Sequence, residues 1–336
     1  MSRVTTASAR LVAGTIAALV LSACSTVQDG TTRSLTPTDA SLSQSPELNS
    51  TRHLFHTKQF YARPGGTGKG TGIYFHGGTV ITSPATKVVA IYWGNPNYAG
   101  LPTAGSNTGA NDGTLIGTFL RSLGGSAYFG INTSYYNASS VPVQNQVTYT
   151  SYWHTGAAGD PVPSSAPTDA DMIALIRYGI TNNKIAYDAT TVYAIFTASG
   201  VNLGGGFGSQ YCAYHTHGST ASGQTFYYAA MPYNQQYPSG CTSSLASPNT
   251  DVAANSEVNT LAHEIEETTT DAMGNAWFDN RGYENADKCA WIWGTTQTAS
   301  NGGKYNMTFS DGKQYLVQQN WVNVGSGGCA LSLPIA

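Results

Sequence analysis

The sequence predicts one α/β domain in which helices cover a mixed β-sheet, with an α+β arrangement as the alternative. Three runs of β-branched and aromatic residues, at 87–93, 191–197 and 224–233, have the composition of buried strands. Helical patterns follow at 114–123 and 169–182, and Thr168 or Asp169 can cap the second of them at its N-terminus. Strands that alternate with helices favour a sheet with helices packed on its faces.

The N-terminus has the pattern of an export signal. Arg3 and Arg10 precede an unbroken run of apolar and small residues at 11–23, which is too short to span a bilayer comfortably. We therefore predict that residues 1–23 are a signal peptide. The motif LSAC, which ends at Cys24, is similar to a bacterial lipobox, in which the cysteine is acylated. Acylation of Cys24 would anchor the mature protein to a membrane outside the cytoplasm, whereas ordinary cleavage would release it by secretion.

The segment after the signal is polar, and the whole chain carries little charge. Residues 25–50 have scarcely a large apolar side chain, so they cannot bury enough surface to fold. We predict a disordered tether at 24–60 and a single domain at 61–336. Only 10% of the residues are charged, against about 25% in an ordinary soluble domain, and the formal net charge is −3. Because no basic tract is present, the sequence argues against nucleic acid as a partner.

Five cysteines are present, and Cys24 accounts for one of them. The other four form an even set, which favours disulfides in an oxidising compartment. Three pairings are open to four cysteines. Nearest-neighbour pairing closes two modest loops, and we therefore predict the disulfides Cys212–Cys241 and Cys289–Cys329. A four-cysteine metal site is disfavoured because no Cys-x-x-Cys pair occurs.

One helix, predicted at 255–272, carries the strongest candidate for chemistry. Asn255 or Ser256 can cap its start. An apolar stripe follows one face of the helix, and His263 and Glu267 lie on the opposite side. Their spacing of four residues places both side chains on one face, where they can bind a single ion.

The motif at 263–267 is His-Glu-x-x-Glu, which differs at one position from the His-Glu-x-x-His of zinc hydrolases. In those enzymes the intervening Glu polarises a water molecule on the metal, so Glu264 is the candidate general base. His263 and Glu267 are candidate ligands for a divalent cation. Zn²⁺ accepts such a set, and the oxygen ligands also suit Mn²⁺ or Ca²⁺.

A downstream acidic segment supplies further candidates. Glu284 is the predicted third ligand, and Asp287 is predicted to orient His263 from behind, with Asp271 or Asp287 as a candidate fourth ligand. Acids are dense between 264 and 271, where a cation would relieve their repulsion. His215 lies in an extended segment and is a candidate for stabilising charge during catalysis. The alternative is a solvent-exposed acidic helix with an incidental histidine.

Several motifs, in the same order along the chain, resemble those of the Exordium or phosphate-induced protein family, which is known from plant cell walls and from bacteria. They are Tyr74-Phe75-His76-Gly77-Gly78, VVAIYWG at 88–94, Cys212-Ala213-Tyr214-His215, the motif at 263–267, Trp277, Glu284-x-x-Asp287-x-Cys289, and Tyr315-Leu316-Val317 leading to Cys329. The resemblance implies an extracellular protein and supports the two predicted disulfides. Plant members are associated with growth and carbohydrate-linked signalling. The helix followed by a downstream Glu is also similar to the zincin arrangement of metallopeptidases.

Two functional hypotheses follow. The first is an exported metal-dependent hydrolase, peptidase-like, with His263, Glu267 and Glu284 as ligands and a peptide or cell-wall carbohydrate as substrate. The second is a non-catalytic protein of the cell surface or cell wall, whose metal site is structural or vestigial. An open site with three protein ligands favours the first hypothesis, and a closed site with four favours the second.

Overall fold

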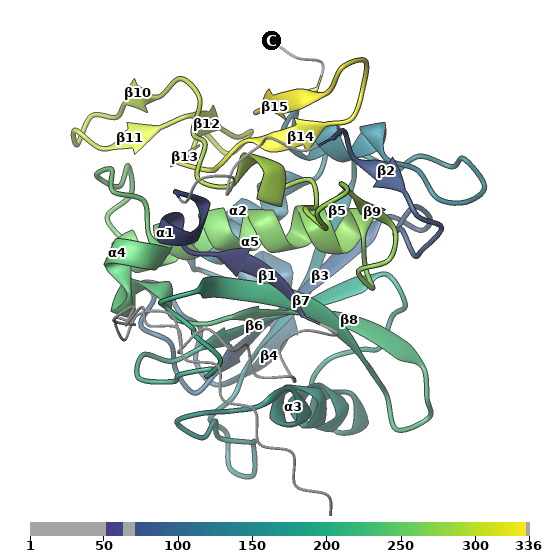
Figure 1. Ribbon diagram of the computed structural model, residues 1–336. Helices are drawn as coiled ribbons and strands as arrows, with labels where there is room; N and C mark the ends of the chain where they lie inside the picture. The colour runs from purple at the N-terminus through teal and green to yellow at the C-terminus, as the bar shows by residue number, and fades with distance from the viewer. Residues whose placement is uncertain (1–51, 63–70, 334–336) are drawn as a thin grey trace, which may run out of the picture. The chain divides into compact units, whose positions relative to one another are not determined.

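The computed structural model describes residues 52–62 and 71–333, and its centre is a mixed seven-stranded sheet with the order β1-β7-β8-β6-β3-β5-β4 (Figure 1). The four central strands run parallel, whereas β7 pairs antiparallel with β8, β1 with β7, and β4 with β5. In chain order the strands are β1 (His53–His56), β3 (Thr86–Trp93), β4 (Gly105–Thr108), β5 (Val147–His154), β6 (Thr191–Thr197), β7 (Tyr211–Ser219) and β8 (Thr225–Met231). The predicted α/β class is confirmed.

Helices cover both faces of this sheet. α3 packs on one face, and α2 and α5 pack on the other (Figure 1). Each face of the sheet has its own hydrophobic core, and alternate residues of β3 pack into one or the other. Val88 and Ala90 face α2 and α5, whereas Val89 and Ile91 face α3. A central parallel strand is buried on both sides, which is why its sequence is a continuous apolar run. The helices are α1 (Lys58–Tyr61), α2 (Leu115–Leu123), α3 (Asp169–Thr181), α4 (Pro238–Cys241) and α5 (Val252–Thr270).

Short elements connect and cover the sheet. Four two-stranded pairs lie outside it among the described residues, namely β2 (Tyr74–Phe75) with β9 (Trp277–Phe278), β10 (Gln297–Thr298) with β11 (Lys304–Tyr305), β12 (Met307–Thr308) with β13 (Gln314–Tyr315), and β14 (Asn320–Val322) with β15 (Gly328–Ala330). The 3₁₀ turns are η2 (Gly109–Asn111), η3 (Phe129–Ser134), η4 (Asn234–Gln236) and η5 (Asp287–Cys289).

The helices begin at residues that cap their first free N–H groups. Thr168 closes a capping box with Asp171 at the start of α3, as predicted for that position. α5 begins earlier than the predicted residue 255. Its cap is Asp251, whose carboxylate accepts a hydrogen bond from the Ala254 N–H at 2.9 Å.

α5 is enclosed on all sides. The sheet lies against one side, and the C-terminal strand pairs lie beyond the other (Figure 1). Every residue from 253 to 270 is buried, including the acids of the motif. The solvent-exposed acidic helix that the sequence left open as an alternative is therefore wrong.

The ordered fold also begins earlier along the chain than predicted. Residues 53–60, which the sequence assigned to the tether, form β1 and all of α1 except Tyr61. β1 pairs with β7 at the edge of the main sheet, and His53 stands opposite His215. The Trp291 indole N–H donates to the His56 carbonyl oxygen at 3.0 Å, which fastens the strand to the C-terminal half.

The predicted signal peptide at 1–23, the candidate lipidation site Cys24 and the tether as far as residue 51 lie outside the described residues. Within the ranges that the structure describes, no helix has both the length and the apolar character needed to cross a membrane.

Both predicted disulfides are confirmed. Cys212–Cys241 joins β7 to α4, with 5.3 Å between the Cα atoms, and Cys289–Cys329 joins η5 to β15, with 5.6 Å. The second bond fixes the segment that follows Glu284 against the C-terminal strand pair. The disulfide therefore joins η5 and β15 covalently on the side of α5 that faces away from the sheet.

We expect the double variant Cys289→Ser/Cys329→Ser to lower the free energy of unfolding. The disulfide closes a loop with a sequence separation of 40, and loss of that constraint from the unfolded chain costs about 4 kcal/mol at most. Urea unfolding under oxidising conditions measures the change. A midpoint equal to that of the wild type would contradict this role for the bond.

Candidate metal centre

α5 presents the predicted motif to the buried interior. His263 and Glu267 lie one turn apart, and His263 Nε2 is 3.1 Å from Glu267 Oε2. Both side chains, and that of Glu264 between them, are inaccessible to solvent. The helical spacing therefore brings the residues together as predicted.

The neighbours of His263 determine which of its ring nitrogens carries the proton. The Gln318 side-chain amide donates to the Ala286 carbonyl oxygen at 2.8 Å, and the same nitrogen lies 3.1 Å from His263 Nδ1. Nδ1 therefore accepts a hydrogen bond, and a neutral ring carries its proton on Nε2. Burial lowers the pKa of His263 to about 4, so the ring is neutral at pH 7. His263 thus turns a hydrogen, rather than a lone pair, towards Glu267.

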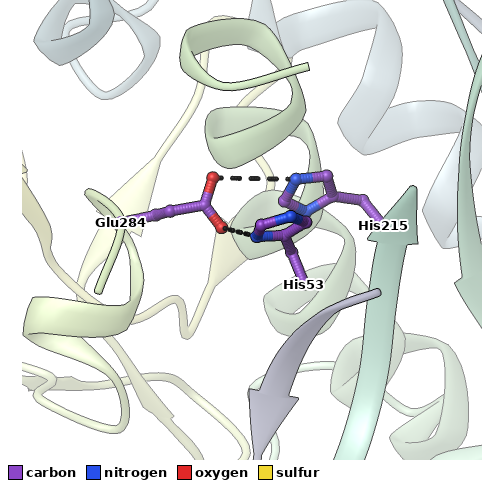
Figure 2. Close-up of side chains that lie close together, drawn as sticks. All are labelled: His53, His215 and Glu284. Carbon is purple, nitrogen blue, oxygen red and sulfur yellow. Dashed lines mark ion pairs between the residues drawn. The ribbon is translucent and has the colours of Figure 1, made fainter. Parts of the chain in front are cut away.

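A second set of side chains meets beside α5, and its members come from three separate segments. His53 on β1 and His215 on β7 stack with ring centroids 5.0 Å apart. Glu284 reaches both rings: one carboxylate oxygen lies 3.1 Å from His53 Nδ1, and the other lies 3.7 Å from His215 Nε2 (Figure 2). Ligand atoms at about 2.1 Å from a tetrahedral cation lie about 3.4 Å apart. The two separations therefore suit a shared cation.

His215 has the orientation that a metal ligand needs. Its Nδ1 lies 3.3 Å from Glu264 Oε2 and 3.7 Å from Glu267 Oε2. When Glu264 is ionised, Nδ1 donates its proton to this carboxylate, and the lone pair of Nε2 then faces Glu284. Among the described residues Nε2 has no hydrogen-bond partner, although it is completely buried. A carboxylate that holds the far nitrogen of a histidine is the usual support of a metal ligand.

Three groups of residues bring one ligand atom each within 4.8 Å of the others: His53, His215 and Glu284; His215, Glu264 and Glu267; and His263, Glu267 and Asp287. The second group would use the nitrogen of His215 that carries the proton. The third would use the nitrogen of His263 that carries the proton. The first group uses neither of these nitrogens, and its two imidazoles and one carboxylate form a known zinc ligand set.

Burial favours a cation at this site. Desolvation raises the pKa of Glu284 well above its usual value, and the neighbouring carboxylates, with Glu267 first among them, raise it further. Burial also lowers the pKa of His53 to about 4 and that of His215 well below its usual value. Neutral imidazoles are the form that binds metal, and a cation would replace the proton that Glu284 otherwise retains.

The predicted partners of His263 are therefore arranged differently from the prediction. Glu284, predicted to share an ion with His263 and Glu267, instead contacts His53 and His215. Asp287 stands near His263, with 3.7 Å between Oδ1 and Nε2, and Tyr61 donates to the same oxygen at 2.5 Å.

Asp287 and Asp271 also organise the backbone around the site. The Asp287 N–H donates to Glu267 Oε1 at 2.8 Å, which fixes the acidic segment against α5. Asp271 ends the helix, and its Oδ1 accepts the N–H groups of Asn275 and Ala276, each at 2.6 Å. Its other oxygen has no hydrogen-bond partner in the described ranges.

Sequence reasoning missed His53, Tyr61 and Gln318. His53 lies in a four-residue strand that exists because it pairs with β7, so its local sequence gives a weak signal. The apolar pair Leu54 and Phe55 within a polar stretch was the sign that could have identified it. No local signal marks Gln318 as the neighbour of His263, which lies 55 residues earlier.

Comparison with known proteins agrees with the motifs. Residues 167–330 match a family model described as the phosphate-induced protein 1 conserved region. This part of the chain belongs to the phosphate-induced protein family. The resemblance predicted from the sequence is therefore confirmed. The chain matches neither a curated protein nor a solved structure, and the likeness to zincins stays a prediction.

The phosphate-induced region contains most of the candidate site. β7, α5 and the acidic segment lie inside the matched residues, and they supply His215, Glu264 and Glu284. His53 precedes the phosphate-induced region and enters the site through the pairing of β1 with β7. The candidate ligand set is thus completed by a segment outside the family match.

Gly274 supports the position of His53. Its backbone has φ +67°, and a Cβ at this residue would lie 1.6 Å from His53 Nε2. We expect Gly274→Ala to displace the ring and to lower both stability and cation affinity. Gly302→Ala is the matched control, because Gly302 has φ +84° but nothing within 4 Å of a Cβ. Backbone strain alone costs about 1–2 kcal/mol, so equal effects of both variants on unfolding and cation binding would contradict the proposed contact.

The metal-free protein should lose stability as pH rises. Burial raises the pKa of Asp287 to about 8, so the folded state keeps a proton that the unfolded chain releases near pH 4. This stabilisation is complete below about pH 4 and is lost as pH approaches about 8. Plotted against pH, the free energy of unfolding should therefore fall less steeply in Asp287→Asn, by up to about 1.4 kcal/mol per pH unit. Urea unfolding in chelator across this range is the measurement, with the exposed Asp311→Asn as control, and an unchanged slope would refute the assignment.

Proposed function

We propose that the protein is a metal-dependent hydrolase of the peptidase type, whose cation is bound by His53, His215 and Glu284. The observation that carries this proposal is the meeting of two neutral imidazoles and one carboxylate, with the separations of 3.1 and 3.7 Å. Several zinc peptidases use two histidines and one glutamate and leave the fourth coordination position to a water or substrate. The two nitrogen ligands favour Zn²⁺ over Mn²⁺ or Ca²⁺.

The exposure of the three ligands supports an open position at one side. The His53 side chain is 26% exposed, whereas those of His215 and Glu284 are 0% and 2% exposed. A substrate would therefore approach over β1, where the edge of the sheet faces solvent. An ionised Glu264 would keep the lone pair of His215 directed at the cation, so Glu264 is a positioning residue in this arrangement.

A bound divalent cation would polarise a substrate carbonyl and lower the pKa of a nearby water. Asp271 is the chain's best candidate to hold a proton beside it. Burial raises the pKa of Asp271 to about 6, and its carboxylate interacts with that of Glu284. A group that titrates near neutrality can accept and release a proton during turnover. Asp271 thus takes the role that the motif alone assigned to Glu264.

A second candidate function is a non-catalytic protein of the cell surface, in which the cation is structural. The burial of Glu264, Glu267 and Asp287 around the site favours this alternative, because enclosed ligands suit structural cations. A cell-wall carbohydrate would then be a binding partner rather than a substrate.

We also propose that the protein is exported and is held at a membrane by a lipid on Cys24. Its two disulfides support an oxidising compartment, where such bonds persist.

Metal analysis and a peptide-cleavage screen test the assignment together. We expect about one zinc per wild-type chain, and an affinity at least about tenfold lower in His53→Ala and Glu284→Gln. Peptide cleavage should be lost in both variants. His76→Ala is the control, because His76 stacks on Phe278 away from the ligand set and should keep the metal and the activity.

The outcomes separate the two functions. Metal retained without cleavage of a broad peptide library would favour the structural role. Metal retained by His53→Ala and Glu284→Gln at wild-type affinity would show that the ligands are assigned wrongly. Wild-type protein without metal after growth and purification with zinc would refute both functions.

A further inference from the structure

Glu266 is a buried acid that the candidate metal centre does not use. Its side chain is inaccessible to solvent, and neither carboxylate oxygen has a hydrogen-bond partner in the described part of the chain. Burial alone raises its pKa well above the usual value. A buried carboxylate without a partner is costly, so its surroundings need an explanation.

Four buried amides come from the segments that cover this part of α5: Asn132, Asn285, Gln318 and Asn320. We call them, with Glu266, the amide cluster. The Asn285 side-chain nitrogen donates to Asn132 Oδ1 at 2.9 Å and lies 3.5 Å from the Glu266 carbonyl oxygen. The backbone carbonyl oxygen of Asn285 in turn accepts a hydrogen bond from the backbone N–H of Trp321 at 2.9 Å. These contacts join η3, the segment before η5 and β14 to the helix.

Two tyrosines place the Glu266 carboxylate in the same region. Tyr128 donates to the Gln318 carbonyl oxygen at 3.0 Å, and Tyr135 donates to the Trp321 carbonyl oxygen at 2.6 Å. After burial, the Glu266 carboxylate is the next cause that raises the pKa of both phenols. The Tyr128 hydroxyl also lies beside the Asn320 amide. The carboxylate and the amides therefore share one neighbourhood.

The amide cluster contains an unusual concentration of unpaired acceptors. Buried oxygens without a hydrogen-bond partner are both oxygens of Glu266, Asn285 Oδ1, Gln318 Oε1 and Asn320 Oδ1. Native proteins leave few buried polar atoms unpaired, and a cluster of them indicates a bound water or ion. Two donors of the amide cluster, Asn132 Nδ2 and Asn320 Nδ2, also lack a partner. Since five unpaired acceptors stand against these two donor groups, a cation satisfies the oxygens better than a rearrangement of the amides can.

We propose that the amide cluster binds a second cation, of the calcium type. Ca²⁺ takes carboxylate and amide oxygens, often with a bidentate carboxylate, at about 2.3–2.6 Å. The five acceptor oxygens include no nitrogen or sulfur ligand, which distinguishes this site from the histidine site. With a single carboxylate the affinity belongs in the weak range of extracellular calcium modules. The ion would join α5 to η3 and β14 and would hold the layers around the helix together.

Calcium titration of the full chain tests the proposal. Protein freed of calcium by a chelator is titrated by calorimetry, and its Tm is measured with and without Ca²⁺. We expect about one site in the wild type, a higher Tm with Ca²⁺, and an affinity at least about tenfold lower in Glu266→Gln. Glu257→Gln is the matched control, because Glu257 is an equally buried acid of α5 whose oxygens are bonded by Asn234. It should bind Ca²⁺ as the wild type does.

A second variant keeps the proposal testable if Glu266→Gln does not fold. Asn320→Asp adds a carboxylate to the amide cluster and should strengthen Ca²⁺ binding by about tenfold. No calcium response in the wild type, as for a cluster that holds only water, would overturn the proposal. A wild-type response in Glu266→Gln, or weaker binding in Asn320→Asp, would overturn it as well. Zinc content is measured in parallel and should not change, so failure here leaves the proposed function untouched.

Discussion

The contact between His215 and Glu264 controls which atoms of the buried cluster are suited to a cation. When Glu264 is ionised it holds the proton of His215 on Nδ1, and this leaves the lone pair of Nε2 on the side of His53 and Glu284. α5 therefore stands behind the site as its support, and β1 stands in front of it. Glu264 of the helix motif thus orients the candidate ligand His215, which lies on β7.

The composition of α5 explains why so many segments converge on it. A buried helix that carries acids and amides must find a partner for each polar group, because water is excluded. Asn234 bonds to Glu257, and the Asn259 side chain accepts the Gln318 N–H at 2.8 Å. Each such contact fixes a different segment against the helix. The C-terminal strand pairs and 3₁₀ turns are thus positioned by polar contacts as much as by apolar packing.

Local sequence was sufficient for the elements whose signal is local. The strand at Thr191–Thr197 and the capped helix at Asp169–Thr181 lie where composition and capping predicted them. Cysteine spacing also led to the correct disulfides. β1 escaped prediction because its four residues gain strand structure only by pairing with β7, where His56 stands opposite Tyr211, 155 residues further along the chain.

The proposed ligand set differs from the one predicted from the sequence for a similar reason. Helical periodicity places His263 and Glu267 on one face, and they do lie 3.1 Å apart. Whether a ring nitrogen there carries a lone pair or a hydrogen depends on Gln318, which approaches from another segment. Spacing along a helix defines neighbours, but the tautomer of each histidine is set by contacts that only the fold creates.

The edge position of β1 links metal affinity to local opening of the sheet. β1 has one neighbouring strand, β7, so it can separate without disrupting the central sheet. Each such separation would withdraw His53 and leave the cation with two protein ligands. A bound cation would in turn favour the paired state of β1, because its affinity for the site with three ligands is higher than for the site with two. The rate at which β1 separates from β7 would then set how long the cation stays bound.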